Sequence, residues 1–315
     1  MTRSLSDLLK KRAKSVMNNY HTPVLLKEVI DLLQVKAGKK YIDATIGGGG
    51  HAKALLEKGA KVLGIDTDQD ALEYVHNNQK SAVGSKRLIL AKGNFKDLEE
   101  IAHLNDFNSV SGILFDLGIS SHQVDDAGRG FSFLKEGPLD MRMDKEQSVT
   151  AETLVNLLGK EELYDLFNKL GQEHRAWAVS SSIVGARKIK AIQTTQDLAD
   201  VVAKAYGITG EVSDFTKNKI NQKVFQALRM AVNNELENIQ VALPQALRLL
   251  EAKGKIAVIS FHSLEDGIVK KTFKEFSKLG LGEIITEKPI GVKDEEREQN
   301  SRSRSAKLRV FEKII

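Results

Sequence analysis

Short apolar runs alternate with longer amphipathic stretches over roughly the first 120 residues, a pattern typical of strands and helices that take turns along the chain. Three of the runs that we interpret as strands reach an acidic residue at their carboxyl ends, namely Asp43, Asp66 and Asp116. A further strand is predicted at Arg87–Ala91, shortly before Phe95. This alternation indicates an α/β fold with a parallel sheet and right-handed crossovers. Because ligands collect at the carboxyl ends of such strands, we expect the three acids and Phe95 to converge on one crevice.

The alternation stops beyond Gln123, where turn-rich, charged segments follow. From about Thr150 to Leu243 the apolar residues recur at helical spacing, almost without strand-like runs. The sheet resumes with a fifth strand at Lys255–Phe261, directly before His262. We therefore predict a helical insertion at 130–230, between the fourth and fifth strands.

The N-terminal region carries two helical patterns. Residues 1–20 form a basic amphipathic arm, which we interpret as a solvated or docking helix, with an organelle-targeting segment as the alternative. A second helix is expected at 22–33, with Thr22 as its N-cap and Pro23 in its first turn.

The C-terminal region contains two further strand-like runs. Gly282–Ile290 and Ser305–Ile314 are predicted to close the sheet as an antiparallel hairpin. Between them, Asp294–Lys307 is charged and rich in serine, so we expect a mobile loop there.

Four consecutive glycines, Gly47–Gly50, follow the strand that ends at Asp43 and precede a helical pattern. Glycine adopts positive φ without a steric penalty and lets the backbone approach a ligand closely. Asp66 lies 17 residues after Gly49, near the distance at which an acid after the second strand accepts the hydroxyls of a ribose. The stretch therefore predicts a nucleotide-binding βαβ unit, with either a dinucleotide or S-adenosylmethionine as cofactor.

Two residues favour the methyl donor over the dinucleotide. A dinucleotide prefers G-x-G-x-x-G, but the position that would hold the third glycine, counted from Gly47, is Ala52. The Asp43 carboxylate would repel a pyrophosphate, whereas it suits a cofactor with a cationic amino-acid end. A glycine-rich loop without any ligand is disfavoured, because ordering four glycines costs conformational entropy and buries nothing.

Composition narrows the class of protein. The chain has 315 residues, 41% of them hydrophobic, which is enough for a large core. Its net charge of +5 is compatible with an anionic partner without proving one. The absence of cysteine excludes disulfides, thiolate zinc sites and a cysteine nucleophile. We expect no metal site and no membrane-spanning segment, because the sequence has neither a His/Cys cluster at ligand spacing nor a run of about 20 apolar residues.

Seven blocks between about residue 20 and residue 312 occur in the order expected for one family. With them the chain resembles the ribosomal small-subunit RNA cytosine-N4 methyltransferases, the RsmH or MraW family. A single glycine-rich loop would be a weak signal, but this ordered set is specific. The blocks are His21–Leu26, Gly48–His51, Asp116–Ser121, Arg129–Phe133, Gly137–Met143, Phe225–Arg229 and Ser260–Asp266.

The resemblance implies S-adenosylmethionine as the methyl donor and the exocyclic amine of a cytidine near the decoding site of 16S ribosomal RNA as the acceptor. We also interpret Asp116 as a candidate for holding the target amine, and His262 as a second candidate for the target pocket. Carried over by matching position, the cofactor contacts fall on Gly48, Gly49, Gly50, His51, Asp66, Phe95, Asp116 and Gln123.

The predicted organisation is a basic arm at 1–20, a Rossmann-like class I methyltransferase domain at 21–129 and 231–315, and an RNA-recognising helical insertion at 130–230. The expected partner is small-subunit ribosomal RNA, free or in an assembled subunit, in the cytoplasm. The oligomeric state stays open, with a homodimer as one option. Two alternatives remain at this stage: an NAD-linked oxidoreductase, and a non-catalytic RNA-binding factor for ribosome assembly.

Overall fold

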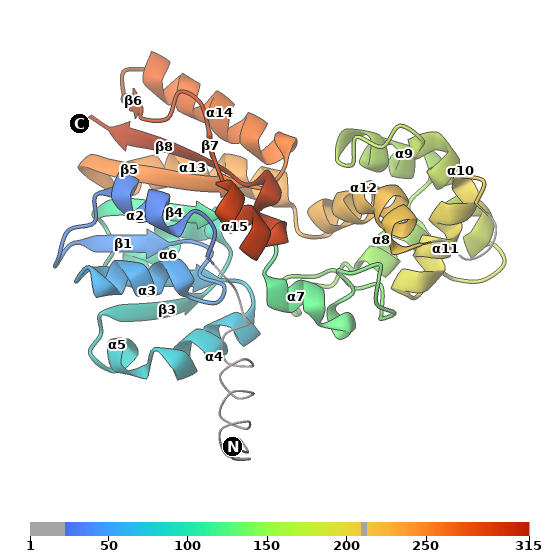
Figure 1. Cartoon of the computed structure of the whole chain (residues 1–315), viewed down its shortest axis with the longest axis horizontal. Coiled ribbons are helices and arrows are strands. Elements are labelled where there is room, and N and C mark those ends of the chain that lie inside the picture. Colours follow the sequence, from blue (N-terminus) through green and yellow to red (C-terminus); the bar gives the residue numbers. More distant parts are fainter. Residues whose placement is uncertain (1–22, 209–212, 315) are drawn as a thin grey trace, which may run out of the picture. The chain divides into compact units, whose positions relative to one another are not determined.

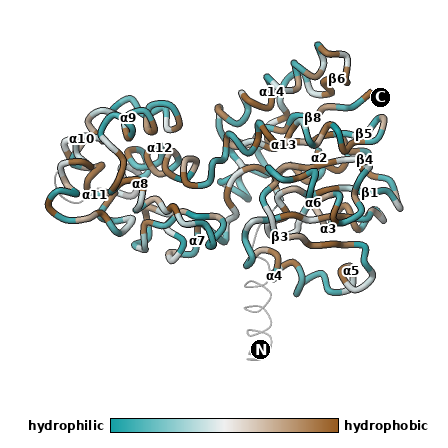
Figure 2. The backbone as a smooth tube through the Cα atoms, turned by 180° about the vertical axis from the view of Figure 1, so that it is seen from behind, coloured by the Kyte–Doolittle hydropathy of each residue, from teal (hydrophilic) through white to brown (hydrophobic). Residues whose placement is uncertain are grey.

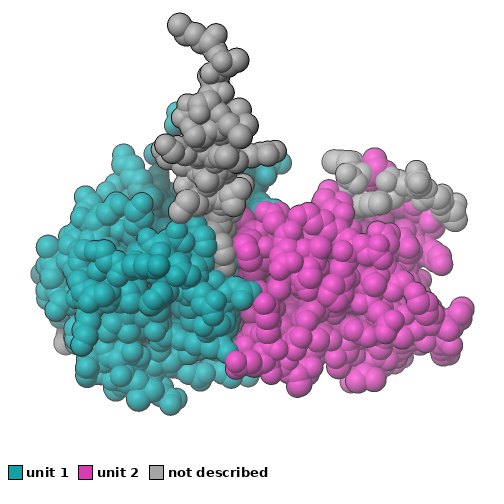
Figure 3. All heavy atoms as spheres, turned by 90° about the horizontal axis from the view of Figure 1, so that it is seen from below, with its two compact units in different colours: residues 1–120, 236–315 teal, residues 121–235 magenta. Residues whose placement is uncertain are grey.

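The computed structural model describes residues 23–208 and 213–314. Contacts within the chain divide it into two compact units, residues 1–120 with 236–315 and residues 121–235, which Figure 3 shows in teal and magenta. The predicted basic arm at 1–20 and the predicted Thr22 cap lie outside the described residues.

The first unit is built on a single sheet, which in the described residues has the order β3-β2-β1-β4-β5-β8-β6, with β7 also paired to β8 (Figure 1). The first five strands in this order are parallel, and β8 pairs antiparallel with its neighbours. The α/β fold and the closing antiparallel strands are therefore confirmed. The strands are β1 (Lys40–Asp43), β2 (Lys61–Asp66), β3 (Leu88–Lys92), β4 (Val110–Asp116), β5 (Leu250–Ser260), β6 (Gly282–Ile284), β7 (Ile290–Gly291) and β8 (Lys307–Lys313).

Helices cover both faces of this sheet, and each face has its own apolar core. Residues of α6, α13 and α14 pack on one face, and residues of α2, α3 and α4 pack on the other. Because the central strands are buried on both faces, they are continuous apolar runs in the sequence, and Figure 2 shows hydrophobic residues along them. The helices of this unit are α2 (Leu26–Leu33), α3 (Gly50–Glu57), α4 (Gln69–Asn78), α5 (Lys80–Gly84), α6 (Leu98–Leu104), α13 (Glu235–Leu249), α14 (Ser263–Lys278) and α15 (Asp294–Gln299).

The second unit is helical throughout the elements described in it. Its turn-rich start is tied down by Arg129, whose Nη2 donates to the carbonyls of Arg142 (3.0 Å) and Met143 (2.9 Å). The Asn233 side chain in turn accepts from the Met143 amide (2.8 Å) and donates to the Met141 carbonyl (2.8 Å). These contacts attach residues on either side of the predicted 130–230 insertion to the helical unit. Its helices are α7 (Ser121–Asp125), α8 (Ala151–Leu157), α9 (Lys160–Lys169), α10 (Ala176–Arg187), α11 (Thr195–Ala205) and α12 (Asp214–Val232).

Three local predictions were wrong. The helix expected from residue 22 begins at Leu26, because Leu25 adopts a left-handed conformation with φ of 54°. The segment expected to be a loop at 294–307 contains α15 and a 3-10 turn at Ser301–Ser305, in which the Ser303 hydroxyl donates to the Asn300 carbonyl (2.7 Å). The fifth strand begins at Leu250 rather than at Lys255, and its register against β4 shifts between these two residues.

None of the helices in the described part of the chain is both long and apolar enough to cross a lipid bilayer.

The turn at Gly130 gives a test of the helical unit. Gly130 has φ of 70°, and a Cβ placed there would overlap the Pro138 carbonyl oxygen. We expect Gly130→Ala to lower the free energy of unfolding of this unit by about 2 to 4 kcal/mol, because the substitution combines an unfavourable φ with a backbone overlap. Chemical denaturation followed by the fluorescence of Trp177, the single tryptophan of the chain, measures this change in the unit that contains Trp177.

Gly185→Ala is the matched control, because Gly185 lies inside α10 and a Cβ added there would enter open space. There the substitution should stabilise the unit by up to about 1 kcal/mol, since alanine favours the helix. Equal denaturation midpoints for the two variants would contradict the account of the Gly130 turn.

Candidate functional site

The strand order reverses next to β1, because β2 and β3 lie on one side of it and β4 and β5 on the other. At such a point the loops that follow neighbouring strands diverge and leave a crevice for a ligand. Here the two loops are tied together at their bases. The Ala44 amide donates to the Leu114 carbonyl (2.9 Å), and the Asp116 amide donates to Thr45 Oγ1 (2.7 Å). The ends of β1 and β4 are thereby fixed relative to each other.

The four-glycine turn after β1 uses its conformational freedom at two positions. Gly47 has φ of 47° and Gly49, the N-cap of α3, has φ of 74°. The Gly49 amide donates to the Ile46 carbonyl (2.7 Å), which closes the turn around Gly48. The turn therefore requires glycine for its backbone path, as the sequence predicted.

Gly49 and Gly50 are also required by the protein atoms around them. A Cβ at Gly49 would come within 2.9 Å of Val75 Cγ2, and one at Gly50 would come within 2.9 Å of Pro23 Cγ. At these two positions, glycine therefore leaves room for neighbouring side chains of the same unit. Their cofactor contacts stay predictions that follow from the family resemblance.

Asp66, at the end of β2, is half-buried beside the glycine turn. Its Oδ2 accepts the Gly47 amide (2.8 Å) and its Oδ1 accepts the Asp68 amide (2.9 Å). Each carboxylate oxygen has a second acceptor position, so both remain able to accept a ribose hydroxyl. Burial raises the pKa of Asp66 to about 6, against the opposing effect of the hydrogen bonds from these two amides.

Asp116 and His51 meet across the strand reversal. His51 lies in the first turn of α3 and is 4% exposed. Its Nε2 is 3.0 Å from the Val24 carbonyl, which fixes the proton on that nitrogen, and its Nδ1 is 3.6 Å from Asp116 Oδ2. The imidazole therefore bridges a backbone carbonyl and the acid at the end of β4.

The remaining residues predicted to converge at this edge are Asp43 and Phe95. Asp43 is 1% exposed and accepts the Thr45 amide at 3.4 Å, so it belongs to the interior of the turn. Phe95 is half-buried, and its ring meets the Phe115 ring edge-on with centroids 5.8 Å apart. Phe95 thus contributes to the core, and its contact with adenine stays a prediction.

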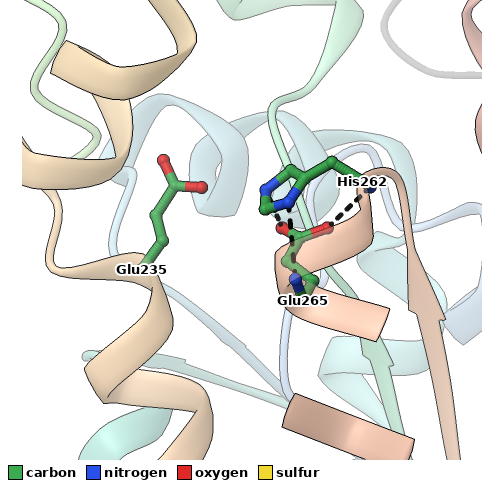
Figure 4. Close-up of side chains that lie close together, drawn as sticks. All are labelled: Glu235, His262 and Glu265. Atoms are coloured by element: carbon green, nitrogen blue, oxygen red, sulfur yellow. Dashed lines mark hydrogen bonds and ion pairs between the residues drawn. The ribbon is translucent and has the colours of Figure 1, made fainter. Parts of the chain in front are cut away.

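His262 follows β5 and is the N-cap of α14. Its Nδ1 accepts the Glu265 amide at 3.4 Å, and its Nε2 lies 3.1 Å from Glu265 Oε1 (Figure 4). Glu265 Oε2 accepts the Phe261 amide (2.8 Å). Nδ1 therefore serves as the acceptor of the helix cap, and Nε2 lies close to the Glu265 carboxylate.

Gln123 and Glu235 lie in the helical unit. Gln123, on α7, is 6% exposed, and its predicted cofactor contact stays a prediction. Glu235, also drawn in Figure 4, pairs with Arg229 of the same unit, with both nitrogen–oxygen distances at 2.8 Å. The first unit by itself contains the glycine turn, His51, Asp66, Phe95, Asp116 and His262.

Comparison with known proteins identifies the family. A model described as the MraW methylase family matches residues 18–314. The chain belongs to the MraW methylase family. A ribosomal RNA small subunit methyltransferase H from Coprothermobacter proteolyticus is 45% identical, with 95% of this chain and 98% of that protein covered. The protein of the same name from Persephonella marina is 45% identical, with coverage of 93% and 99%. The resemblance drawn from the seven sequence blocks is therefore confirmed.

A solved structure of a methyltransferase from Streptococcus mutans, in complex with SAH, aligns with this chain. The alignment covers 93% of this chain and 100% of the Streptococcus mutans chain. Its sequence identity is 13% and its TM-score is 0.43.

The pKa of Asp66 predicts a pH dependence of donor binding. Ribose hydroxyls donate hydrogen bonds and so favour the ionised carboxylate, which is lost below the pKa of about 6. The dissociation constant of S-adenosylmethionine should rise about tenfold from about pH 8 to about pH 5, because each pH unit below a pKa lowers the ionised fraction about tenfold. Isothermal titration calorimetry measures this constant.

Asp66→Ala is the control, and it should bind the donor more weakly at every pH and without this dependence. A dissociation constant that stays level over the same range in the unaltered chain would exclude Asp66 as the ribose acceptor.

Proposed function

We propose that this chain transfers a methyl group from S-adenosylmethionine to the N4 amine of a cytidine in small-subunit ribosomal RNA. The observation that carries the proposal is the placement of two acids, Asp66 and Asp116, at strand ends on opposite sides of β1, with the glycine turn between them. The names of the relatives support the substrate class, since both are ribosomal RNA small subunit methyltransferases.

The residues of the first unit fit S-adenosylmethionine by their chemistry. Asp66 offers two carboxylate oxygens to ribose hydroxyls, held in place by the Gly47 and Asp68 amides. Asp116 offers negative charge close to the turn, which suits a sulfonium and an amino-acid end. Phe95 presents a half-buried ring to a purine.

The chain's main catalytic task is alignment of the target amine. The lone pair of a cytosine N4 is delocalised into the ring, so the amine is a weak nucleophile and must be held in line with the methyl group. S-adenosylmethionine supplies an activated methyl carbon on a positively charged sulfur. Proximity and orientation contribute up to about 7 to 11 kcal/mol, so a strong base is not required. We assign Asp116, or the backbone carbonyls directly after it, to accept a hydrogen bond from the amine.

His262 is the second candidate in the target pocket. Glu265 lies against both ring nitrogens, with its amide donating to Nδ1 and its carboxylate 3.1 Å from Nε2. These contacts support a role in shaping the pocket, with Glu265 holding the orientation of the ring.

The helical unit is the proposed RNA-binding part, and the target cytidine lies near the decoding site. A base that reacts at a sheet edge must be unstacked, and RNA recognition favours such splayed bases. We further propose that the enzyme works in the cytoplasm on the RNA or on the assembled subunit. Of the cationic side chains in and around the insertion, Arg129 is buried and Arg229 pairs with Glu235. The exposed ones proposed for phosphate contacts are Lys188, Lys190, Lys219 and Lys223.

Asp116→Asn tests the alignment role. We expect the rate of methyl transfer at saturating donor to fall about a hundredfold, because a group that orients the reacting atoms acts mainly in the transition state. Tritiated-methyl transfer to small subunits that lack the mark measures the rate, and nucleoside analysis identifies the product. Donor affinity is measured separately by calorimetry, with NAD as the competing cofactor.

His262→Asn is the companion variant, since asparagine is a good N-cap and keeps the start of α14. If Asp116→Asn loses only donor affinity and keeps its saturated rate, Asp116 is a cofactor residue alone. Binding of NAD in place of S-adenosylmethionine would overturn the proposed reaction, and binding of neither would leave a non-catalytic RNA-binding factor.

Salt dependence tests the assignment of RNA binding. We expect RNA affinity to fall about tenfold to a hundredfold between about 50 and about 200 mM salt, because several phosphate contacts release counterions. Donor affinity should change less than about twofold, since it depends on few charges. Filter binding and calorimetry measure the two constants.

Lys188→Ala, an exposed residue of the helical unit, should reduce the salt slope of RNA binding by about one. Lys58→Ala is the control. Lys58 is the C-cap of α3, next to the amino end of β2, whereas the proposed site lies at the carboxyl ends of the strands. Equal salt slopes for RNA and donor binding would contradict RNA recognition by this unit.

A further inference from the structure

Leu25 has a strained backbone that is held by a distant carboxylate. Its φ of 54° is unusual for a residue other than glycine, and its side chain is 1% exposed. The Leu25 amide donates to Glu296 Oε1 at 2.9 Å, across 271 positions of sequence. Both residues belong to the first unit. The hydrogen bond to Glu296 therefore supports a conformation that leucine does not favour by itself.

The turn that contains Leu25 also sets the position of the glycine turn. Pro23 lies against Gly50 so closely that no Cβ fits between them. The Val24 carbonyl is 3.0 Å from His51 Nε2. Because Val24 immediately precedes Leu25, a change at the Leu25 amide moves the carbonyl that fixes the His51 ring.

Helix α15 presents Glu296 from an anchored position. Val292, just before the helix, and Ala306, after the following 3-10 turn, are buried in the same apolar core as Val24 and Leu25. Lys293 Nζ pairs with Glu28 of α2 at 3.3 Å. Glu296 is half-buried, whereas its neighbours Glu295 and Glu298 are exposed. One carboxylate of this acidic helix is thus directed inward while the others are solvated.

We propose that Glu296 is a positioning residue for the methyl-donor site. It holds the Leu25 amide, and through the Val24 carbonyl it fixes the imidazole of His51 beside Asp116. The inference rests on the proposed contact between His51 and the cofactor. It assigns a role in donor binding to the acidic helix, which lies 245 positions after His51 in the sequence (296 − 51).

The test compares Glu296→Ala with Glu296→Gln, which keeps an acceptor oxygen, and with Glu298→Ala as the exposed control on the same helix. Calorimetry with S-adenosylhomocysteine and kinetics with S-adenosylmethionine give donor affinity, KM and kcat. We expect Glu296→Ala to raise the dissociation constant and the KM about tenfold, the effect expected if only about a tenth of the molecules keep the Val24–Leu25 turn in its binding-competent arrangement. The kcat should stay within about twofold, because the donor, once bound, is held in the same place.

Glu296→Gln should keep the affinity within about threefold of the unaltered chain, since the acceptor remains, and Glu298→Ala should change nothing. Unaltered affinity in Glu296→Ala, or an equal loss in Glu296→Gln and Glu296→Ala, would overturn the inference. His51→Ala distinguishes failure of the Glu296 role from failure of the proposed cofactor site. Normal donor binding by His51→Ala would reject the proposed contact between His51 and the cofactor. Weak binding by His51→Ala together with normal binding by Glu296→Ala rejects only the role of Glu296.

Discussion

The contact of one buried imidazole with two partners organises the site. His51 joins the carbonyl of Val24, in the segment before the sheet, to the carboxylate of Asp116 at the end of β4. Nε2 is committed to the carbonyl, and Nδ1 faces the carboxylate at 3.6 Å. The ring, placed between a carbonyl dipole and an acid, holds three chain segments at fixed spacing. The glycine turn can therefore keep one conformation although its own residues favour none.

The acidic groups of the site are ordered before a ligand binds. Asp66 is fixed by the Gly47 and Asp68 amides, and the Asp116 backbone is fixed by the Thr45 hydroxyl. Groups that are already ordered lose little entropy when a ligand arrives, so more of each contact appears as affinity. The methyl-transfer reaction gains most from such order, because alignment of the amine with the methyl carbon is its main requirement.

The sequence predicted the strands and the acids at their ends, because buried parallel strands leave continuous apolar runs and the acids interrupt them. It also identified the family, since the seven blocks are local. Leu25 could not be predicted, because its left-handed conformation depends on Glu296, and no local pattern encodes a bond across 271 positions. The helix at Asp294–Gln299 was missed for a similar reason: its charged composition is typical of a loop, and its order depends on Val292 and Ala306 in a distant core.

Asp66 also shows how the site affects stability. Its pKa is raised from 3.8 to about 6, so the folded state binds a proton more tightly than the unfolded chain does. The protonated acid favours the folded state, and this contribution to stability is complete below the unfolded pKa of 3.8 and is lost as the pH rises through about 6. The ionised acid therefore destabilises the folded chain at neutral pH. The Gly47 and Asp68 amides offset part of this cost. A ribose would offset more of it, because hydroxyl donors stabilise the same ionised form. Donor binding would thus offset the free-energy cost of burying the ionised Asp66 carboxylate. The stability of the first unit is in this way coupled to occupancy of the site by the donor.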